Sequence, residues 1–358
     1  MRRPATKPIA TILASFLLAL TSNAQAPAPD TAGRLDKNGD GRISRTEVQG
    51  TAAEQRFDAL DRNKDGYITA DEFPRARRTA PASAERPGSS ESVRTLNVPY
   101  APAPPGVDVN LLSLDIYAPK DAANLPVMIY IHGGGWHRGD KAAVSLKPGY
   151  FTTRNFIFVS LNYRLVPAVD ILTQLQDSAN AIAWVHSNIA RHGGDPARLH
   201  LIGHSAGAHH VAILATNERF LKNAGAEVSI FSSVVELDTM ALDVPKLMRN
   251  SRTEAYAQAF GADPEVWRQI SPLQHVTPGK GIPPFLLVVA GGVRPKLEQA
   301  AAFQKALEAA GVRCEVIEAP QHDHGSVNRS IGAPGDEVTA ALEKFINNGD
   351  GPTFSESR

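Results

Sequence analysis

The 358-residue sequence contains a single cysteine, Cys314, so no disulfide can form within the chain. Acidic and basic residues are equally numerous, at 37 each, and no basic cluster or nucleic-acid motif stands out, so nucleic acid is not an expected partner. No dinucleotide or phosphate loop occurs, and no organic cofactor is therefore expected. The length allows one large domain and a small one.

The first 26 residues have the features of a secretory signal peptide. Arg2 and Arg3 begin a basic segment, residues 9–20 are apolar, and an A-x-A cleavage pattern ends at Ala26. The apolar stretch is short for a membrane span, although a retained anchor is the alternative. We therefore expect a mature chain that begins near residue 27, is secreted or periplasmic, and has no membrane span.

Two twelve-residue segments, 36–47 and 61–72, match the calcium-binding EF-hand loop in full. Each would surround one Ca²⁺ ion with side-chain oxygens and one backbone carbonyl, and such hard oxygen donors favour calcium over zinc or copper. The expected ligands are Asp36, Asn38, Asp40, Arg42 and Glu47 in the first loop, and Asp61, Asn63, Asp65, Tyr67 and Glu72 in the second, with Arg42 and Tyr67 contributing carbonyls. Two Ca²⁺ sites are predicted.

The two loops are close enough in sequence that one helix, about 45–60, must serve both. This arrangement resembles the compact EF-hand pairs of secreted bacterial proteins, in which Ile43 and Ile68 would meet in a short β-bridge. We expect a small all-α EF-hand pair over residues 30–76, with docking onto a protein partner as the alternative role. Residues 77–93 are rich in Ala, Pro, Ser and Gly and are interpreted as a flexible linker.

Two glycine-rich motifs follow, each directly after an apolar run. Residues 203–207 read Gly-His-Ser-Ala-Gly, the nucleophile elbow that raises the hydroxyl of Ser205 above a sheet edge. Residues 132–136 read His-Gly-Gly-Gly-Trp, and backbone amides in such a loop can bind an oxyanion. The amides of Gly134, Gly135 and Ala206 are the expected oxyanion hole.

From residue 94 to residue 347, short apolar runs alternate with helical segments. This pattern predicts an α/β domain with a mostly parallel sheet and helices on both faces, followed by a tail over 348–358. Strands are expected at 111–117, 127–131, 157–162, 199–202, 232–237, 285–290 and 314–318. Helices are expected at 172–190, 206–216, 254–260, 297–310 and 336–347. The insertion at 239–281 is interpreted as a helical cap whose apolar residues line a substrate pocket or pack onto the domain.

Together these segments resemble the α/β-hydrolase carboxylesterases of the hormone-sensitive-lipase-like kind, close to kynurenine-formamidase-like and feruloyl-esterase-like members. Besides the two motifs, the matching pieces are 114–119, 139–141, 162–165, 193–196 and 324–325. The resemblance implies that the protein is a serine hydrolase, which cleaves a small or aryl carboxylic ester through an acyl-enzyme. It also implies that Arg164 and Asp177 belong to the structural scaffold.

The general base is expected at His324, because this fold places its histidine between the last strand and the C-terminal helix. His322 is the alternative. A base is needed, since a serine hydroxyl is a poor nucleophile until its proton is removed.

The third member of the triad departs from the family pattern. Members usually carry an aspartate just after the strand equivalent to 285–290, but Arg294 stands there, and an arginine cannot stabilise an imidazolium. Asp238, directly after the preceding strand, is the expected substitute, with Glu298 and Asp323 as alternatives. If none of them serves, the alternative is a calcium-dependent binding protein on a degenerate hydrolase fold.

Overall fold

The computed structural model describes residues 42–49, 54, 57–61, 66–69, 92–251 and 253–348. The chain divides into two compact units, Met1–Ala84 and Glu85–Arg358. The expected signal peptide and tail, and nearly all of the expected linker, lie outside the described residues. Within those residues, every helix is too short or too polar to cross a membrane.

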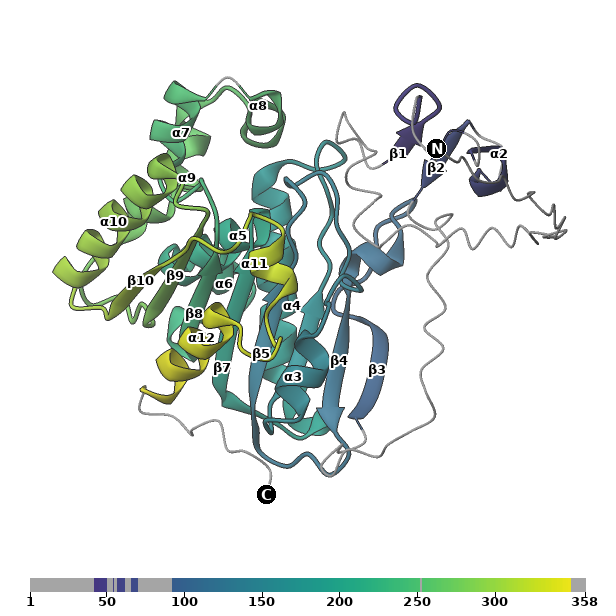
Figure 1. Cartoon of the computed structure of the whole chain (residues 1–358). Coiled ribbons are helices and arrows are strands. Elements are labelled where there is room, and N and C mark those ends of the chain that lie inside the picture. The colour runs from purple at the N-terminus through teal and green to yellow at the C-terminus, as the bar shows by residue number, and fades with distance from the viewer. Residues whose placement is uncertain are drawn as a thin grey trace, which may run out of the picture. The chain divides into compact units, whose positions relative to one another are not determined.

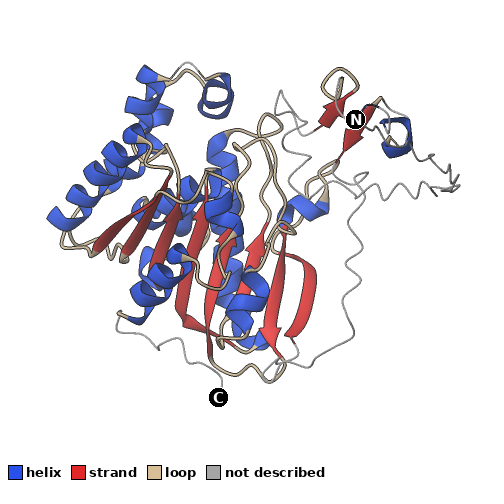
Figure 2. Ribbon diagram, in the orientation of Figure 1, coloured by secondary structure: helices blue, strands red, loops and turns tan. Residues whose placement is uncertain are grey.

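The described residues of the first unit form two short strands, β1 (Arg42–Ser44) and β2 (Tyr67–Thr69), and one turn of α-helix, α2 (Phe57–Leu60). The strands are antiparallel, and Ile43 lies opposite Ile68, so the expected β-bridge is present (Figure 2). Both isoleucines pack with Val48 and Phe57 in a small buried cluster. The expected helix over 45–60 is wrong at its start, because residues 45–49 form turns. Gly50 and Thr51 in this stretch are weak helix formers.

The second unit is built on an eight-stranded sheet with the order β10-β9-β8-β7-β5-β6-β4-β3 (Figure 1). The six strands from β10 to β6 in that order run parallel, and β4 and β3 are antiparallel at one edge. Their bounds are β3 (Ser92–Pro99), β4 (Ser113–Pro119), β5 (Leu125–Ile131), β6 (Ile157–Leu161), β7 (Gly194–His204), β8 (Phe231–Leu237), β9 (Phe285–Ala290) and β10 (Cys314–Ala319). The predicted fold class is confirmed.

Helices cover both faces of this sheet (Figure 2). One core cluster joins the sheet to α4 (Ile171–Asn188), α5 (Ala206–Thr216) and α10 (Arg294–Ala309). The other joins it to α3 (Lys147–Thr152) and α12 (Glu337–Asn347). Successive side chains of a strand point to opposite faces, so strands buried on both faces are apolar throughout, and this explains why the central strands were predictable.

The expected elements agree with the structure where the apolar pattern is strong. The strand at 285–290 and the helices at 206–216 and 254–260 coincide with β9, α5 and α8 (Glu254–Phe260). Strand β3 was missed, because its side chains are mostly exposed, and it begins at Ser92 inside the expected linker. The bounds of the remaining short helices were not predicted: α3, α6 (Glu218–Asn223), α7 (Val244–Asn250), α9 (Pro264–Gln269) and α11 (Ser326–Arg329).

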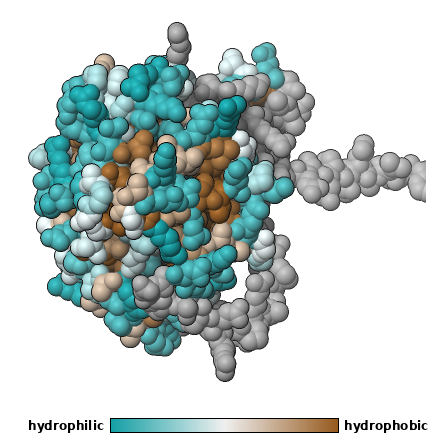
Figure 3. Space-filling view, turned by 90° about the vertical axis from the view of Figure 1, so that its left-hand side faces the viewer, coloured by the Kyte–Doolittle hydropathy of each residue, from teal (hydrophilic) through white to brown (hydrophobic). Residues whose placement is uncertain are grey.

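The insertion at 239–281 forms the expected helical cap. Its helices α7, α8 and α9 gather at the edge of the sheet where the parallel strands end (Figure 1). Leu242 and Phe260 are buried in the main core, whereas Tyr256 and Trp267 are only partly buried. The face shown in Figure 3 carries apolar side chains near its middle, with hydrophilic surface around them. Cys314 is buried, and burial raises the pKa of its thiol to about 12.

Candidate active site

Ser205 occupies a sharp turn between the end of β7 and the start of α5. Its φ of 57° lies in the left-handed region that side chains other than glycine rarely adopt. The flanking glycines make the turn possible. A Cβ at Gly203 would lie 2.2 Å from the carbonyl oxygen of Gly207, and a Cβ at Gly207 would lie 2.1 Å from that of Ile131. The turn therefore has the strained geometry that the motif predicted.

A chain of hydrogen bonds runs from Ser205 to a buried carboxylate. His324 Nε2 lies 2.9 Å from Ser205 Oγ, and His324 Nδ1 lies 2.6 Å from Asp238 Oδ2. Because a carboxylate only accepts, Nδ1 carries the proton and donates it, which leaves the Nε2 lone pair facing the serine hydroxyl. The Asp238 side chain is fully buried, while that of His324 is 52% exposed. The structure thus brings together the three residues singled out from the sequence.

Asp238 is held from several directions. It follows β8 with a φ of 64°, its amide donates to the carbonyl of Val288, and its Oδ1 accepts from the amide of Ala290 at 2.9 Å. Its Oδ2 also accepts from Lys296 Nζ at 2.5 Å. Burial opposes ionisation, but the hydrogen bonds from His324, Lys296 and Ala290 outweigh it and hold the pKa of the carboxyl below its ordinary value.

The alternative acids lie elsewhere. Glu298 is half-exposed and pairs with Arg294 at 3.1 Å, and Arg294 itself is 88% exposed. Asp323 accepts from the amides of Gly325 and Ser326, so it stabilises the loop rather than facing the imidazole of His324.

His322 pairs with Asp336 at 2.9 Å and contacts Ser326 Oγ through its other ring nitrogen. Both of its nitrogens are therefore engaged away from Ser205. Sequence reasoning missed Lys296. One feature of the sequence points to its role: a lysine in the first turn of a helix opposes the helix dipole and needs a compensating carboxylate.

The glycine loop passes directly beside the elbow. A Cβ at Gly133 would lie 3.0 Å from Ser205 Cβ, and one at Gly134, which has a φ of 132°, would lie 1.9 Å from the carbonyl oxygen of Arg138. In the described part of the chain, the amides of Gly134 and Gly135 donate to no backbone carbonyl. Ala206 is the first residue of α5, where a helix amide has no partner within its helix. Among the described residues, the three amides expected to donate to an oxyanion therefore have no backbone acceptor, and the glycine loop passes beside Ser205 at Gly133.

The loop is fixed from behind by its own histidine. His132 Nδ1 donates to the carbonyl of Gly133 at 2.8 Å, and the His132 ring stacks on Tyr163 at 4.4 Å. Burial lowers the pKa of His132 and keeps the ring neutral. Arg164, next to Tyr163, forms a two-pronged ion pair with Asp177 at 2.7 and 2.6 Å, in keeping with its expected structural role.

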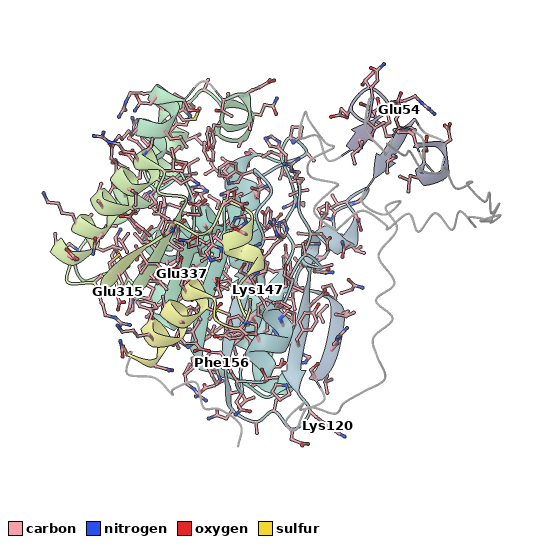
Figure 4. The ribbon with its side chains drawn as sticks, viewed as in Figure 1. Glu54, Lys120, Lys147, Phe156, Glu315 and Glu337 are labelled. Atoms are coloured by element: carbon pink, nitrogen blue, oxygen red, sulfur yellow. The ribbon has the colours of Figure 1, made fainter. Side chains whose placement is uncertain are left out.

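The segment that carries His324 is held by two basic side chains, the partly buried His204 and the fully buried Lys147. His204 donates through Nε2 to the carbonyl of His324 at 2.6 Å, and burial together with the nearby His324 lowers its pKa to about 3. Lys147 donates to the carbonyl of Asn328 at 2.6 Å, beneath α11 (Figure 4). Burial lowers the pKa of Lys147 to about 7. These contacts limit the movement of the imidazole relative to Ser205.

Comparisons with known proteins agree with this arrangement. The BD-FAE family matches residues 114–293, and the EF-hand family matches 33–49 and 53–75. The carboxylesterase NlhH of Mycobacterium tuberculosis is 30% identical over 229 residues, which cover 59% of this chain and 69% of that protein. The isoprenylcysteine alpha-carbonyl methylesterase ICME of Arabidopsis thaliana is 38% identical over 115 residues, but only 27% of that protein is covered.

Solved esterases share the fold. Esterase B from Lactobacillus rhamnosis superimposes with a TM-score of 0.60 and 22% identity, covering 73% of this chain and 88% of that one. A carbohydrate esterase from gut microbiota gives a TM-score of 0.59 and covers 72% and 96%. The chain belongs to the BD-FAE family of α/β-hydrolase esterases. It is a carboxylic ester hydrolase.

The N-terminal unit of this esterase retains parts of both EF-hand loops. Asp61 Oδ2 accepts from the amide of Gly66 at 3.0 Å, across the sharp turn of its loop, and the Asp61 side chain is buried. Glu47 is also buried, and its carboxylate accepts from the amide and hydroxyl of Ser44 at 2.8 and 2.7 Å. Two buried, oriented carboxylates fit a hard divalent cation.

The described part of the N-terminal unit does not contain a complete ligand set, and no cluster of three His, Cys, Asp or Glu residues forms within it. The backbones of Arg42 and Tyr67 are described, as part of β1 and β2. Six of the expected calcium ligands lie outside the described residues: Asp36, Asn38, Asp40, Asn63, Asp65 and Glu72.

Aromatic side chains link the glycine loop of the esterase domain to the cap. The Trp136 ring lies 4.6 Å from Phe260 and 5.9 Å from Tyr256, and these two rings stack on each other within α8. The charge of Asp238 contributes, after burial, to raising the pKa of Tyr256, so this tyrosine lies within electrostatic reach of the acid. A pocket of about 340 Å³ opens beside Phe260. Its apolar lining includes Val166, Ile171, Leu172, Ala259 and Val266.

Proposed function

We propose that this chain is a secreted or periplasmic serine carboxylesterase that hydrolyses a small or aryl ester through an acyl-enzyme intermediate. The observation that carries the proposal is the hydrogen-bonded series Ser205–His324–Asp238, with glycine-loop amides beside the serine. The expectation of export rests on the signal-peptide pattern of the first 26 residues.

In the acylation step, Ser205 Oγ attacks the carbonyl carbon of the ester while its proton passes to His324 Nε2. The carbonyl oxygen becomes an oxyanion that accepts hydrogen bonds from Gly134, Gly135 and Ala206. Asp238 stabilises the imidazolium without taking its proton. The bond to the alcohol oxygen then breaks, and the imidazolium returns the proton to the leaving alcohol.

In the deacylation step, His324 Nε2 removes a proton from water, and the resulting hydroxide attacks the acyl carbon. Collapse of the second tetrahedral intermediate releases the carboxylic acid and returns the proton to Ser205 Oγ. The half-exposed imidazole of His324 is accessible to that water.

Tyr256, the partly exposed member of the aromatic cluster with Trp136 and Phe260, supports an aryl or otherwise flat apolar ester as the substrate. Aromatic walls favour stacked or edge-on rings. Comparing kcat/KM for aryl and alkyl acetates tests this preference, and a clear preference for alkyl esters would contradict it.

The EF-hand unit is proposed to bind two Ca²⁺ ions for stability rather than for catalysis. The family match, the two full loop sequences and the buried Glu47 and Asp61 support binding. None of the expected calcium ligands comes from the esterase domain, which supports a calcium site that takes no part in catalysis.

Ser205→Ala tests the proposed nucleophile. We expect turnover of p-nitrophenyl acetate to fall by at least ~10³-fold, while the melting temperature stays close to that of the wild type. A fluorophosphonate probe should label the wild type at Ser205 and fail to label the variant. Labelling at any other residue, or retained turnover, would overturn the proposal.

A further inference from the structure

Lys296 makes an ion pair with the acid of the proposed triad. Its Nζ lies 2.5 Å from Asp238 Oδ2, the same oxygen that accepts the proton of His324 Nδ1. The Lys296 side chain is 12% exposed and the Asp238 side chain is fully buried, so solvent screens the pair weakly. One carboxylate oxygen is therefore shared between Lys296 Nζ and the imidazole.

The place of Lys296 in the fold is unfavourable unless this contact exists. It lies in the first turn of α10, which has no side-chain cap and carries no acidic residue in that turn. Helix amides there present partial positive charge, so a cation is disfavoured. Arg294, in the same turn, instead extends into solvent towards Glu298. The ion pair with Asp238 offsets this cost for Lys296.

We propose that Lys296 is a positioning residue that orients Asp238 and keeps His324 unprotonated, and hence active as a base, to lower pH. The proposal rests on the proposed function of Ser205, His324 and Asp238. A cation beside the shared oxygen neutralises part of the carboxylate charge, and this makes the imidazolium form of His324 less favourable. Removing the cation leaves the full carboxylate charge to stabilise the imidazolium.

Below about pH 7, on the acidic limb of the pH–rate profile, the other ionisable groups around Asp238 keep one charge state. Burial raises the pKa of Glu236 to about 8. The pKa of His204 is lowered to about 3, and burial followed by the Asp238 charge raises the pKa of Tyr256. His322 faces Asp336 rather than Asp238. Lys147, whose pKa burial lowers to about 7, contacts the carbonyl of Asn328 rather than Asp238, and it is the same in every variant. A shift of the acidic limb between Lys296 variants therefore reports on the His324–Asp238 pair.

The test compares Lys296→Met with Lys296→Arg in the full chain, using kcat/KM for p-nitrophenyl acetate between pH 5 and 9. The midpoint of the acidic limb should move to higher pH by about one unit in Lys296→Met. Lys296→Arg should restore it, because the cation is retained. The shift should persist in 1 M NaCl, where exposed charges are screened.

Arg294→Gln is the matched control, since it removes a positive charge two residues away on the same turn but in solvent. Its limb should stay at the wild-type position. An unshifted limb in Lys296→Met, or an equal shift in Arg294→Gln, would overturn the role of Lys296. Retained activity in Ser205→Ala would instead overturn the underlying function, so the two failures are distinguishable.

Discussion

Replacing Asp238 by asparagine removes the negative charge of the proposed acid and one of its acceptor positions. The carboxylate accepts three hydrogen bonds, from the amide of Ala290, from Lys296 Nζ and from His324 Nδ1. An asparagine has one acceptor oxygen and two amide protons. If the oxygen faces Lys296 and His324, the amide group meets the N–H of Ala290. In the opposite orientation, it meets Lys296 and His324.

Both orientations leave a buried donor without an acceptor, at a cost of about 1–3 kcal/mol in the free energy of unfolding. For a domain of this size, each kcal/mol lowers the melting temperature by about 2–4 °C. In the orientation that turns the amide towards His324, the imidazole must carry its proton on Nε2, so it no longer accepts from Ser205. Loss of the correct tautomer and of the charge should reduce kcat by up to ~10⁴-fold, which is about 5.5 kcal/mol in activation free energy.

The assay is steady-state hydrolysis of p-nitrophenyl acetate, with a thermal melt of the same preparation. Glu298→Gln is the control, because Glu298 is half-exposed and contacts Arg294 rather than His324. It should remain within about twofold of wild-type kcat, as is usual for an exposed site. A folded Asp238→Asn variant within tenfold of the wild type would refute the assignment of the acid.

Two further predictions concern stability. Glu236 is fully buried, its carboxylate accepts from the amide of Thr239, and burial raises its pKa to about 8 from the ordinary 4.5. The folded chain therefore holds a proton that the unfolded chain releases, so stability should fall as pH rises from about 4.5 to 8. Glu236→Gln should remove this loss, so that between pH 5 and 8 its free energy of unfolding gains a few kcal/mol relative to the wild type in denaturant titrations. The same dependence of that free energy on pH in both proteins would contradict the prediction. Calcium added at 100 times Kd to the EGTA-treated full chain should stabilise the EF-hand unit by about 2.7 kcal/mol per site, as measured by calorimetry. Glu47→Gln should lose the contribution of one site. Neither calcium nor this substitution should change the kcat of the esterase.

The parts of the fold that could be predicted are those buried on both faces of the sheet. Strands β5, β6 and β9 are nearly continuous apolar runs, and the pattern leaves few other structures for them. Strand β3 could not be found, because its exposed side chains show no alternation. The short cap helices α7 and α9 each carry a proline in the first turn, which favours a turn in the sequence pattern, whereas α8 has none and was predicted.

The site divides in the same way. Ser205 and the glycine loop were predictable, because a Cβ at Gly203, Gly207 or Gly134 would lie too close to a neighbouring backbone carbonyl. The choice of His324 over His322 depended on which ring faces the elbow, and two residues of spacing in a loop cannot decide that. Lys296 was not predictable as a partner of Asp238, because the contact joins residues 58 apart through a side chain on another element.

The position of Asp238 accounts for the exposed Arg294 and for the contact that Lys296 makes. Leu237 pairs with Val288 across β8 and β9, and the Asp238 amide continues this pairing by donating to Val288. The Asp238 carboxylate then extends over the end of β9 and accepts from the amide of Ala290. A carboxylate from β8 thereby occupies the end of β9, where the resemblance to other esterases led us to expect an acid from the following turn. Since that turn no longer supplies the acid, Arg294 is free to point into solvent, and α10 can bring a cation to Asp238 instead.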